Sequence, residues 1–139
     1  MATFSKQPEG YNTLSPYLIV SDARDAVKFY SDVFGGILVD AIEMDDGRLG
    51  HAELIIGDTV LMLGSEFPEL GFKSPFAYSG TPVSIHLYID DVDDVVAHAL
   101  DAGAQLKAAV EDKFYGDRLG VIIDPWGHHW SLATRISLP

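Results

Sequence analysis

The sequence predicts an α+β fold made of two strand–helix–strand–strand–strand units, and two observations support this prediction. First, the segments PYLIVSDARDAVKFYSDVFGG, from residue 16, and SIHLYIDDVDDVVAHALDAGA, from residue 84, each place an amphipathic helical pattern after a short apolar strand. Second, the two segments correspond to each other at a fixed spacing in the chain. Apolar residues that recur every three or four positions are typical of a helix that packs one face on a core.

Both predicted helices have start and stop signals in the sequence. Asp22 and Asp91 each stand where a side chain can accept a hydrogen bond from the first turn. Gly35 and Gly36 end the first helix and Gly103 ends the second, because glycine readily adopts the left-handed conformation found after helices. The residues expected to face the core are Ala26, Val27, Phe29, Tyr30, Val33 and Phe34 in the first helix, and Val92, Val95, Val96, Ala99 and Leu100 in the second.

The correspondence between the halves indicates an internal duplication. A shift of 69 positions superposes Leu18 on Leu87 and Asp22 on Asp91, and GHAELIIGDTVLMLGSE resembles RLGVIIDPWGHHWSLAT with a two-residue insertion. We therefore expect one domain, 1–139, with a first module at 15–64, an aromatic-rich loop at 65–81 and a second module at 82–135. The remaining strands are expected at 37–44, 51–56, 59–63, 105–112, 118–124 and 129–134.

Composition and charge narrow the classes of partner. The chain has 21 acidic and 9 basic residues, a formal charge of −12, which disfavours nucleic acid. The acidic surface either favours a cationic small molecule or serves solubility alone. With no cysteine, thiolate metal sites and cysteine nucleophiles are excluded. No apolar run is long enough to span a membrane, and the first sixteen residues do not resemble a signal peptide, so the cytoplasm is the expected location.

The segment between the halves, GSEFPELGFKSPFAYSGTP, is a loop with an unusual number of aromatic residues. Phe67, Phe72, Phe76 and Tyr78 either form a hydrophobic cluster within the loop or make a lid or wall that stacks on a planar ligand. The sequence alone leaves both interpretations open.

Four stretches of the chain carry a family resemblance: PYLIVSDARDAVKFY, GHAELIIGDTVLML, SPFAYSGTPVSIHLYIDDVDDVVAHALDAGA and FYGDRLGVIIDPWGHHWSLAT. Together, from about Pro16 to Arg135, they resemble the vicinal-oxygen-chelate superfamily of glyoxalases, bleomycin-resistance proteins and extradiol dioxygenases, and specifically its PhnB-like branch. The resemblance implies a glyoxalase-like fold, in which two curled mixed sheets surround a cavity with the helices outside. It also implies a homodimer.

The resemblance places the usual metal-binding positions on residues that do not suit a metal ion. In metal-dependent members, His, Gln or Glu side chains from the first and last strand of each half hold the ion. Counting back seven residues from each helix cap gives Ser15 and Ser84, and counting on three from His128 gives Ser131, whose counterpart in the first half is Met62. Three hydroxyls and a thioether supply no anionic charge for a divalent ion. We therefore expect no metal at these positions and no cofactor.

The histidines of the stretch DPWGHHW divide between two roles. Strand alternation places His129 on the same face as Ser131, and likewise His86 and Tyr88 on the same face as Ser84. If the serines face the cavity, His86 and His129 do too, either as hydrogen-bonding groups or as ligands of a relocated metal assisted by Glu53 or His51. His128 and Trp130 are interpreted as scaffold.

Further ligand-contacting residues are expected at the cavity. Tyr17 and Met62 are expected to line it, and in the stretch FYGDR Tyr115 and Arg118 are expected to reach its mouth, where Arg118 would clamp an anionic group. The alternative is that Asp117 and Arg118 fix the entry of the strand or a dimer contact.

Three functions remain open at this point. The first is sequestration of a small, aromatic, antibiotic-type molecule without a metal at the usual positions. The second is a glyoxalase-type lyase or isomerase, or a dioxygenase, that uses a relocated metal or a histidine base, with His86 and His129 as the candidate catalytic residues. The third is a dimeric scaffold whose cavity is filled by its own side chains. Whether the protein is an enzyme is therefore undecided from sequence.

Overall fold

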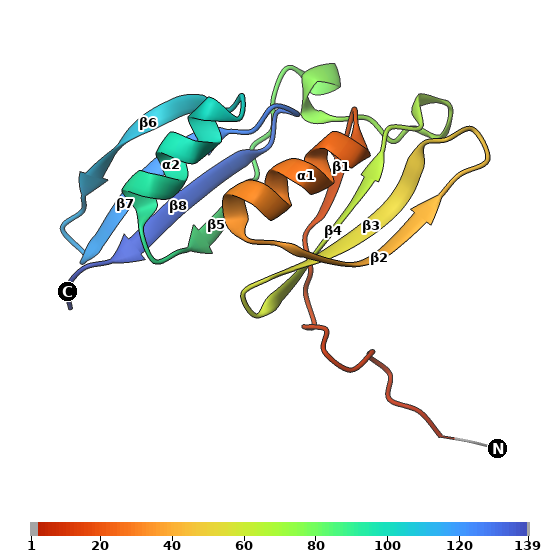
Figure 1. The fold of residues 1–139 in the computed structure, drawn as a ribbon, viewed down its shortest axis with the longest axis horizontal. Coiled ribbons are helices and arrows are strands. Elements are labelled where there is room, and N and C mark those ends of the chain that lie inside the picture. Colours follow the sequence, from red (N-terminus) through yellow and green to blue (C-terminus); the bar gives the residue numbers. More distant parts are fainter. Residues whose placement is uncertain (1–2, 139) are drawn as a thin grey trace.

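A computed structural model describes residues 3–138 of the chain, and its element order is the one expected from the internal repeat (Figure 1). The first half contains β1 (Tyr17–Val20), α1 (Ala23–Phe34), β2 (Ile37–Glu43), β3 (Leu49–Ile56) and β4 (Thr59–Ser65). The second half contains β5 (Ser84–Tyr88), α2 (Val92–Asp101), β6 (Gln105–Asp112), β7 (Asp117–Ile123) and β8 (His129–Arg135). Two short 3-10 helices, Pro68–Leu70 and Pro75–Tyr78, lie between the halves.

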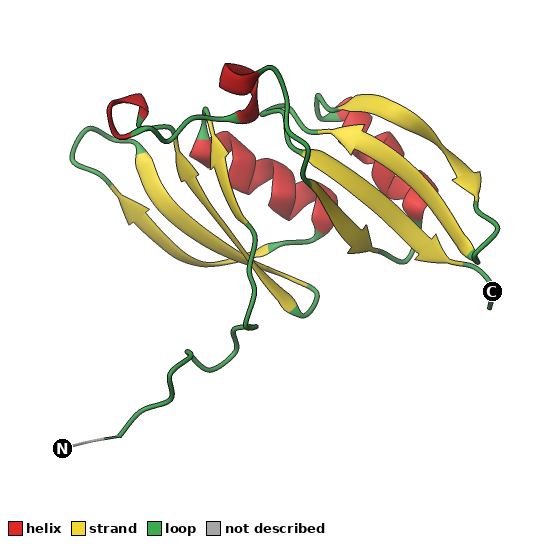
Figure 2. Ribbon diagram, turned by 180° about the vertical axis from the view of Figure 1, so that it is seen from behind, coloured by secondary structure: helices red, strands yellow, loops and turns green. Residues whose placement is uncertain are grey.

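Each half forms its own four-stranded mixed sheet. The strand orders are β1-β4-β3-β2 and β5-β8-β7-β6, and in both sheets the first strand runs parallel to the last while the other pairs are antiparallel. The predicted α+β class and the duplicated βαβββ unit are therefore confirmed. Both helices lie on the same side of the paired modules (Figure 1), and Figure 2 shows the opposite faces of the two sheets.

The helix caps form as the sequence predicts. Asp22 accepts a hydrogen bond from the Asp25 amide and Asp91 accepts one from the Asp94 amide, each at 3.1 Å. Helix α1 ends at Gly35, which has a φ of 71°. Helix α2 ends one residue earlier than Gly103, because Ala102 forms its C-cap and Gly103 then takes the left-handed conformation, with a φ of 106°.

The core lies between each helix and one face of its sheet. Alternate strand residues that point to the helices are buried, and these include Leu18, Leu54, Leu63, Ile122 and Leu132. They pack against the predicted apolar faces of α1 and α2, so the expected buried residues are confirmed, with Val27, Val95 and Leu100 partly buried. The other face of each sheet, which we call the open face, is left available for a site.

A buried polar network joins the two halves within one chain. The Tyr30 hydroxyl of α1 donates to the Asp124 carboxylate at 2.5 Å, and the Trp130 indole N–H donates to the same oxygen at 2.9 Å. The other carboxylate oxygen accepts the backbone N–H groups of Trp126 and His128, each at 3.0 Å. Because Asp124 lies in the β7–β8 turn, this network fixes α1 of the first module against the second module.

The two sheets do not close around a common internal cavity. They lie side by side (Figures 1 and 2), and within residues 3–138 the hydrogen bonds between strands stay inside each sheet. Within the described residues, the open face of each module instead has its own accessible pocket. Neither α1 nor α2 is long and apolar enough to cross a bilayer.

Candidate functional site

A row of four side chains crosses the open face of the first sheet. Strand register places Tyr17 of β1 opposite Met62 of β4, Met62 opposite Glu53 of β3, and Glu53 opposite Asp40 of β2. Two of the four members are carboxylates. The row therefore gives this open face an acidic end, at β2 and β3, and an aromatic end, at β1.

A connected chain of hydrogen bonds lies along this row. The Tyr11 hydroxyl donates to one oxygen of Glu53, and the other oxygen lies 2.6 Å from Nε2 of His51. Nδ1 of His51 lies 2.9 Å from the Tyr17 hydroxyl. The hydrogen bonds from Tyr11 and then from His51 lower the pKa of Glu53, so this largely buried carboxyl group stays ionised at neutral pH. Burial, and then the charge of Glu53, raise the pKa of Tyr17.

An apolar pocket of about 670 Å³ adjoins the aromatic end of the row. Its floor is formed by Gly50 and Gly64, where a Cβ would come within 2.6 Å of the Met44 sulfur and of the Gly50 carbonyl oxygen, respectively. The remaining lining residues are Tyr17, Ile19, Met44, Ser65, Phe67, Leu70 and Phe72. Two of the loop aromatics therefore form a wall of this pocket. They also pair with each other through backbone hydrogen bonds, Phe67 N–H to Phe72 O at 2.9 Å and Phe72 N–H to Phe67 O at 3.1 Å.

The second open face carries the histidines singled out from the sequence. Register places His86 opposite Ser131 and Ser84 opposite His129. Nδ1 of His86 lies 2.9 Å from the Ser131 hydroxyl, and Nδ1 of His129 lies 3.0 Å from the Lys107 ammonium. Burial, followed by the charge of Lys107, lowers the pKa of His129, so its imidazole is neutral at pH 7. Each of these two histidines therefore has a hydrogen-bonding partner on the second sheet.

The donor chemistry of the usual metal positions does not fit a metal ion. Ser15 lies just before β1 and Ser84 is the first residue of β5, while Met62 and Ser131 lie on β4 and β8. A serine hydroxyl and a thioether are neutral, and divalent ions in proteins are held by imidazole, carboxylate or thiolate groups. We derive no chemical step through a metal at these four positions.

The second module has a different pocket, at the end of its sheet. Tyr88, Tyr115 and Asp117 line an open pocket of about 820 Å³ together with Ile89, Asp90, Thr134 and Arg135. The Tyr88 hydroxyl donates to Asp117 at 2.9 Å, and this hydrogen bond, followed by burial, raises the pKa of Tyr88. Tyr115 therefore lines a pocket of the second module. The pocket is polar and shares no lining residue with the apolar pocket of the first module.

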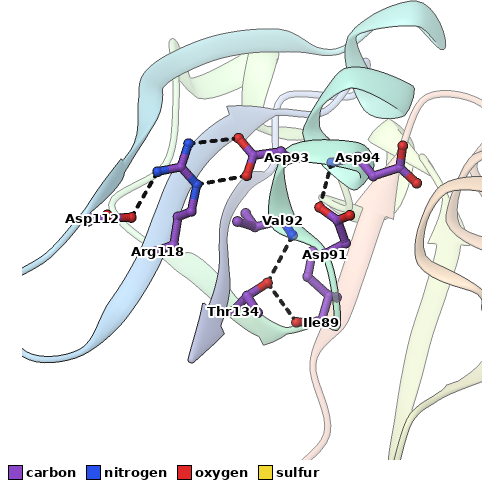
Figure 3. Close-up of polar contacts among 8 residues, drawn as sticks. All are labelled: Ile89, Asp91, Val92, Asp93, Asp94, Asp112, Arg118 and Thr134. Carbon is purple, nitrogen blue, oxygen red and sulfur yellow. Dashed lines mark hydrogen bonds and ion pairs between the residues drawn. The ribbon is translucent and has the colours of Figure 1, made fainter. Parts of the chain in front are cut away.

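The predicted position of Arg118 at the cavity mouth is wrong. Figure 3 shows its guanidinium group between the N-terminal turn of α2 and the end of β6. Nε and one Nη atom donate to the two oxygens of Asp93 at 2.7 and 3.0 Å, and the other Nη atom donates to Asp112 at 2.8 Å. Strand alternation explains the error, because Arg118 and the buried Ile122 are four residues apart on β7 and so share the helix-facing side. Arg118 fixes the strand entry, which is the alternative stated above.

His128 and Trp130 belong to the scaffold. Nε2 of His128 lies 2.8 Å from the carbonyl oxygen of Ile19, and Trp130 is almost fully buried in the core beside Phe34.

A relocated site that joins His86 and His129 to Glu53 or His51 is not what the structure shows. The first two residues lie on the second sheet and the last two on the first, each with separate partners. Tyr11 and Asp40 were not expected in this row from the sequence. The alternation in GHAE already placed His51 and Glu53 on one face, but Tyr11 lies before the first strand and Asp40 reaches the row through a register shift in β2.

Each half of the chain has a sheet with a helix on one face and an open opposite face. Two such halves in one chain define a protein of the glyoxalase-like class. The family model of the Glyoxalase/Bleomycin resistance protein/Dioxygenase superfamily matches residues 11–132, and the chain belongs to this superfamily. It is 46% identical over 126 residues to the uncharacterized protein Mb0911c of Mycobacterium bovis, covering 88% of this chain and 83% of that protein.

Two solved structures show the same fold. Protein PA1353 from Pseudomonas aeruginosa is 23% identical with a TM-score of 0.72, and the match covers 91% of this chain and 99% of that one. The PhnB protein from Bacillus cereus is 16% identical with a TM-score of 0.70, covering 88% and 99% of the two chains. At these identities the similarity concerns the fold, and it agrees with the PhnB-like resemblance read from the sequence.

Proposed function

We propose that this protein binds a small, planar, largely apolar molecule in the pocket of the first module, without a metal at the usual family positions. The observation that supports it is the apolar pocket of about 670 Å³ walled by Tyr17, Phe67 and Phe72. Small-molecule sites are typically of about 300–1,000 Å³ and mostly apolar, and aromatic walls favour flat ligands. The bound molecule is of the kind that antibiotic-binding members of the superfamily sequester.

The charge of the chain favours a cationic ligand over an anionic one. The formal net charge is −12, and the carboxylates of Glu53 and Asp40 lie on the same open face as Tyr17. A field of this sign raises the local concentration of cations and so speeds their association. The Arg48 guanidinium lies over the Phe67 ring, 4.0 Å from its centre, and a cation in this position is attracted to the ring and helps to hold it in place.

The test is a fluorescence titration with proflavine, a planar aromatic cation. Phe72→Ala is expected to weaken binding roughly three- to tenfold, because one aromatic contact contributes about 0.5–1.5 kcal/mol. Phe114→Ala is the matched control, since Phe114 is 99% exposed and lies in the second module. Equal affinities of the wild type and both variants would contradict the assignment of the pocket.

The alternative function, an enzyme of the glyoxalase or dioxygenase type, makes a different prediction about the fate of the ligand. Sequestration returns the bound molecule unchanged, which mass spectrometry after prolonged incubation measures. Conversion of the probe at a rate that depends on protein concentration would replace binding by catalysis as the function. Proflavine recovered intact supports sequestration for this class of molecule.

We also propose a homodimer, supported by the exposed apolar surface of β2. Ile37, Leu38, Val39 and Ile42 are all about half exposed or more. Such patches on one strand mark surfaces that pack against another protein. Light scattering after size exclusion gives the mass directly, and a mass of one chain at all concentrations would contradict the dimer.

A further inference from the structure

A β-bulge brings two carboxylates face to face on the first sheet. Leu38 pairs with Leu54, but the next pair is Asp40 with Glu53, so Val39 is the extra residue on β2. In a regular ladder Val39 would stand opposite Glu53, and Asp40 would point to the helix side. The bulge instead re-aims Asp40 toward the open face, a use of bulges that recurs beside functional sites.

Few basic groups lie beside Asp40 and Glu53 to compensate their negative charge. Like charges directly opposite each other on neighbouring strands destabilise a sheet. Within residues 3–138, no lysine or arginine forms an ion pair with Asp40 or Glu53, and His51 is the one basic group that contacts Glu53. The arrangement therefore has a deficit of positive charge at a fixed point on the open face.

We propose that Asp40, His51 and Glu53 form a binding site for a divalent transition-metal ion. One ligand atom from each residue lies within 4.8 Å of the other two, close enough for small side-chain rotations to bring all three onto a single ion bound at about 2.0–2.2 Å. Two carboxylates neutralise the charge of the ion, and the imidazole adds a nitrogen donor. Glu53 is buried and Asp40 is exposed, so the ion has a route of entry from solvent.

The neighbouring tyrosines hold the ligands in place. The Tyr11 hydroxyl fixes Glu53, and the Tyr17 oxygen lies 2.9 Å from Nδ1 of His51, where it accepts a hydrogen bond in the tautomer that leaves Nε2 as the metal-binding atom. Hydrogen bonds to the second nitrogen of a ligating histidine are a regular feature of metal sites, because they set the tautomer and ring orientation. The mixed nitrogen and oxygen donors favour zinc, iron, manganese or nickel over calcium and magnesium.

Elemental mass spectrometry tests this proposal on untagged, full-length protein. The protein is dialysed to equilibrium against zinc, and in parallel against manganese, and the bound metal is counted per chain. The wild type is expected to hold about one zinc ion per chain, and His51→Gln and Asp40→Asn are expected to lose it. Neither substitution changes the buried Glu53, whose replacement would disturb the packing around it. Circular dichroism verifies the fold of each variant.

His86→Gln is the matched control, because His86 has a comparable hydrogen-bonded setting on the other sheet. It is expected to keep the full metal content. Less than about a tenth of an ion per wild-type chain would overturn the proposal. Metal retained in both first-sheet variants, or lost in His86→Gln, would also overturn it. The metal site adjoins the proposed ligand pocket, because Tyr17 lines that pocket and contacts His51; proflavine titrations of the same variants in metal-free buffer show whether one proposal fails without the other.

Discussion

Removing a single hydroxyl from the buried network, by Tyr30→Phe, measures how firmly the two modules are joined. The ring stays in place, so the main loss is the 2.5 Å hydrogen bond from Tyr30 to the Asp124 carboxylate. Asp124 keeps the Trp130 indole and two backbone amides as donors. A hydrogen bond to a charged group contributes about 1.5–3 kcal/mol, and we expect a loss of that size in the free energy of unfolding.

Urea unfolding followed by tryptophan fluorescence measures this loss, since Trp126 and Trp130 both lie beside Tyr30. For a domain of this length the same loss lowers the melting temperature by roughly 5–10 °C. Tyr78→Phe is the control, because Tyr78 is 63% exposed. A Tyr30→Phe variant within about 0.5 kcal/mol of the wild type would refute the reasoning, as would two separate unfolding transitions in the wild type.

Three further predictions address the caps, the second open face and the strand entry. Asp91→Ala is expected to cost about 1 kcal/mol in urea unfolding through loss of the α2 cap, and an unchanged midpoint would contradict this. Burial and the charge of Lys107 lower the pKa of His129 in the folded protein. As the pH drops below 6.5, the unfolded chain therefore binds a proton that the folded chain does not yet bind, and the free energy of unfolding falls. NMR titration should give a pKa for His129 below 6.5 that rises in Lys107→Ala, and an unchanged value would remove the assigned effect of Lys107. Arg118→Ala is expected to cost less than about 1 kcal/mol and to leave proflavine affinity unchanged, whereas a large loss of affinity would restore a binding role for Arg118.

Local patterns were sufficient to predict the fold. The helix caps at Asp22 and Asp91 depend on residues three positions away, and the apolar spacing of each helix is a property of a dozen neighbouring residues. The duplication then determined the order of the strands in both halves, because corresponding residues had to occupy corresponding strands. The same period-two alternation placed His86, His129 and Ser131 together on the second open face.

The candidate site was less predictable because it depends on long-range contacts. Tyr11 contacts Glu53 across 42 positions in the sequence, and no local pattern indicates that the segment before β1 crosses the sheet. Asp40 is re-aimed by a bulge, and a one-residue shift in register reverses the face of every residue that follows. The error on Arg118 had a simpler origin, since counting from the buried Ile122 would have assigned it to the helix side.

The most direct test of the proposed function is a map of amide chemical shifts in isotope-labelled protein titrated with proflavine. Binding in the pocket of the first module should shift the amides of the residues that surround it, Gly50, Gly64, Phe67 and Phe72, progressively with added probe. The amides of Tyr88 and Asp117, at the polar pocket of the second module, should stay in place. Shifts confined to the second module, or none at saturating probe, would contradict the account.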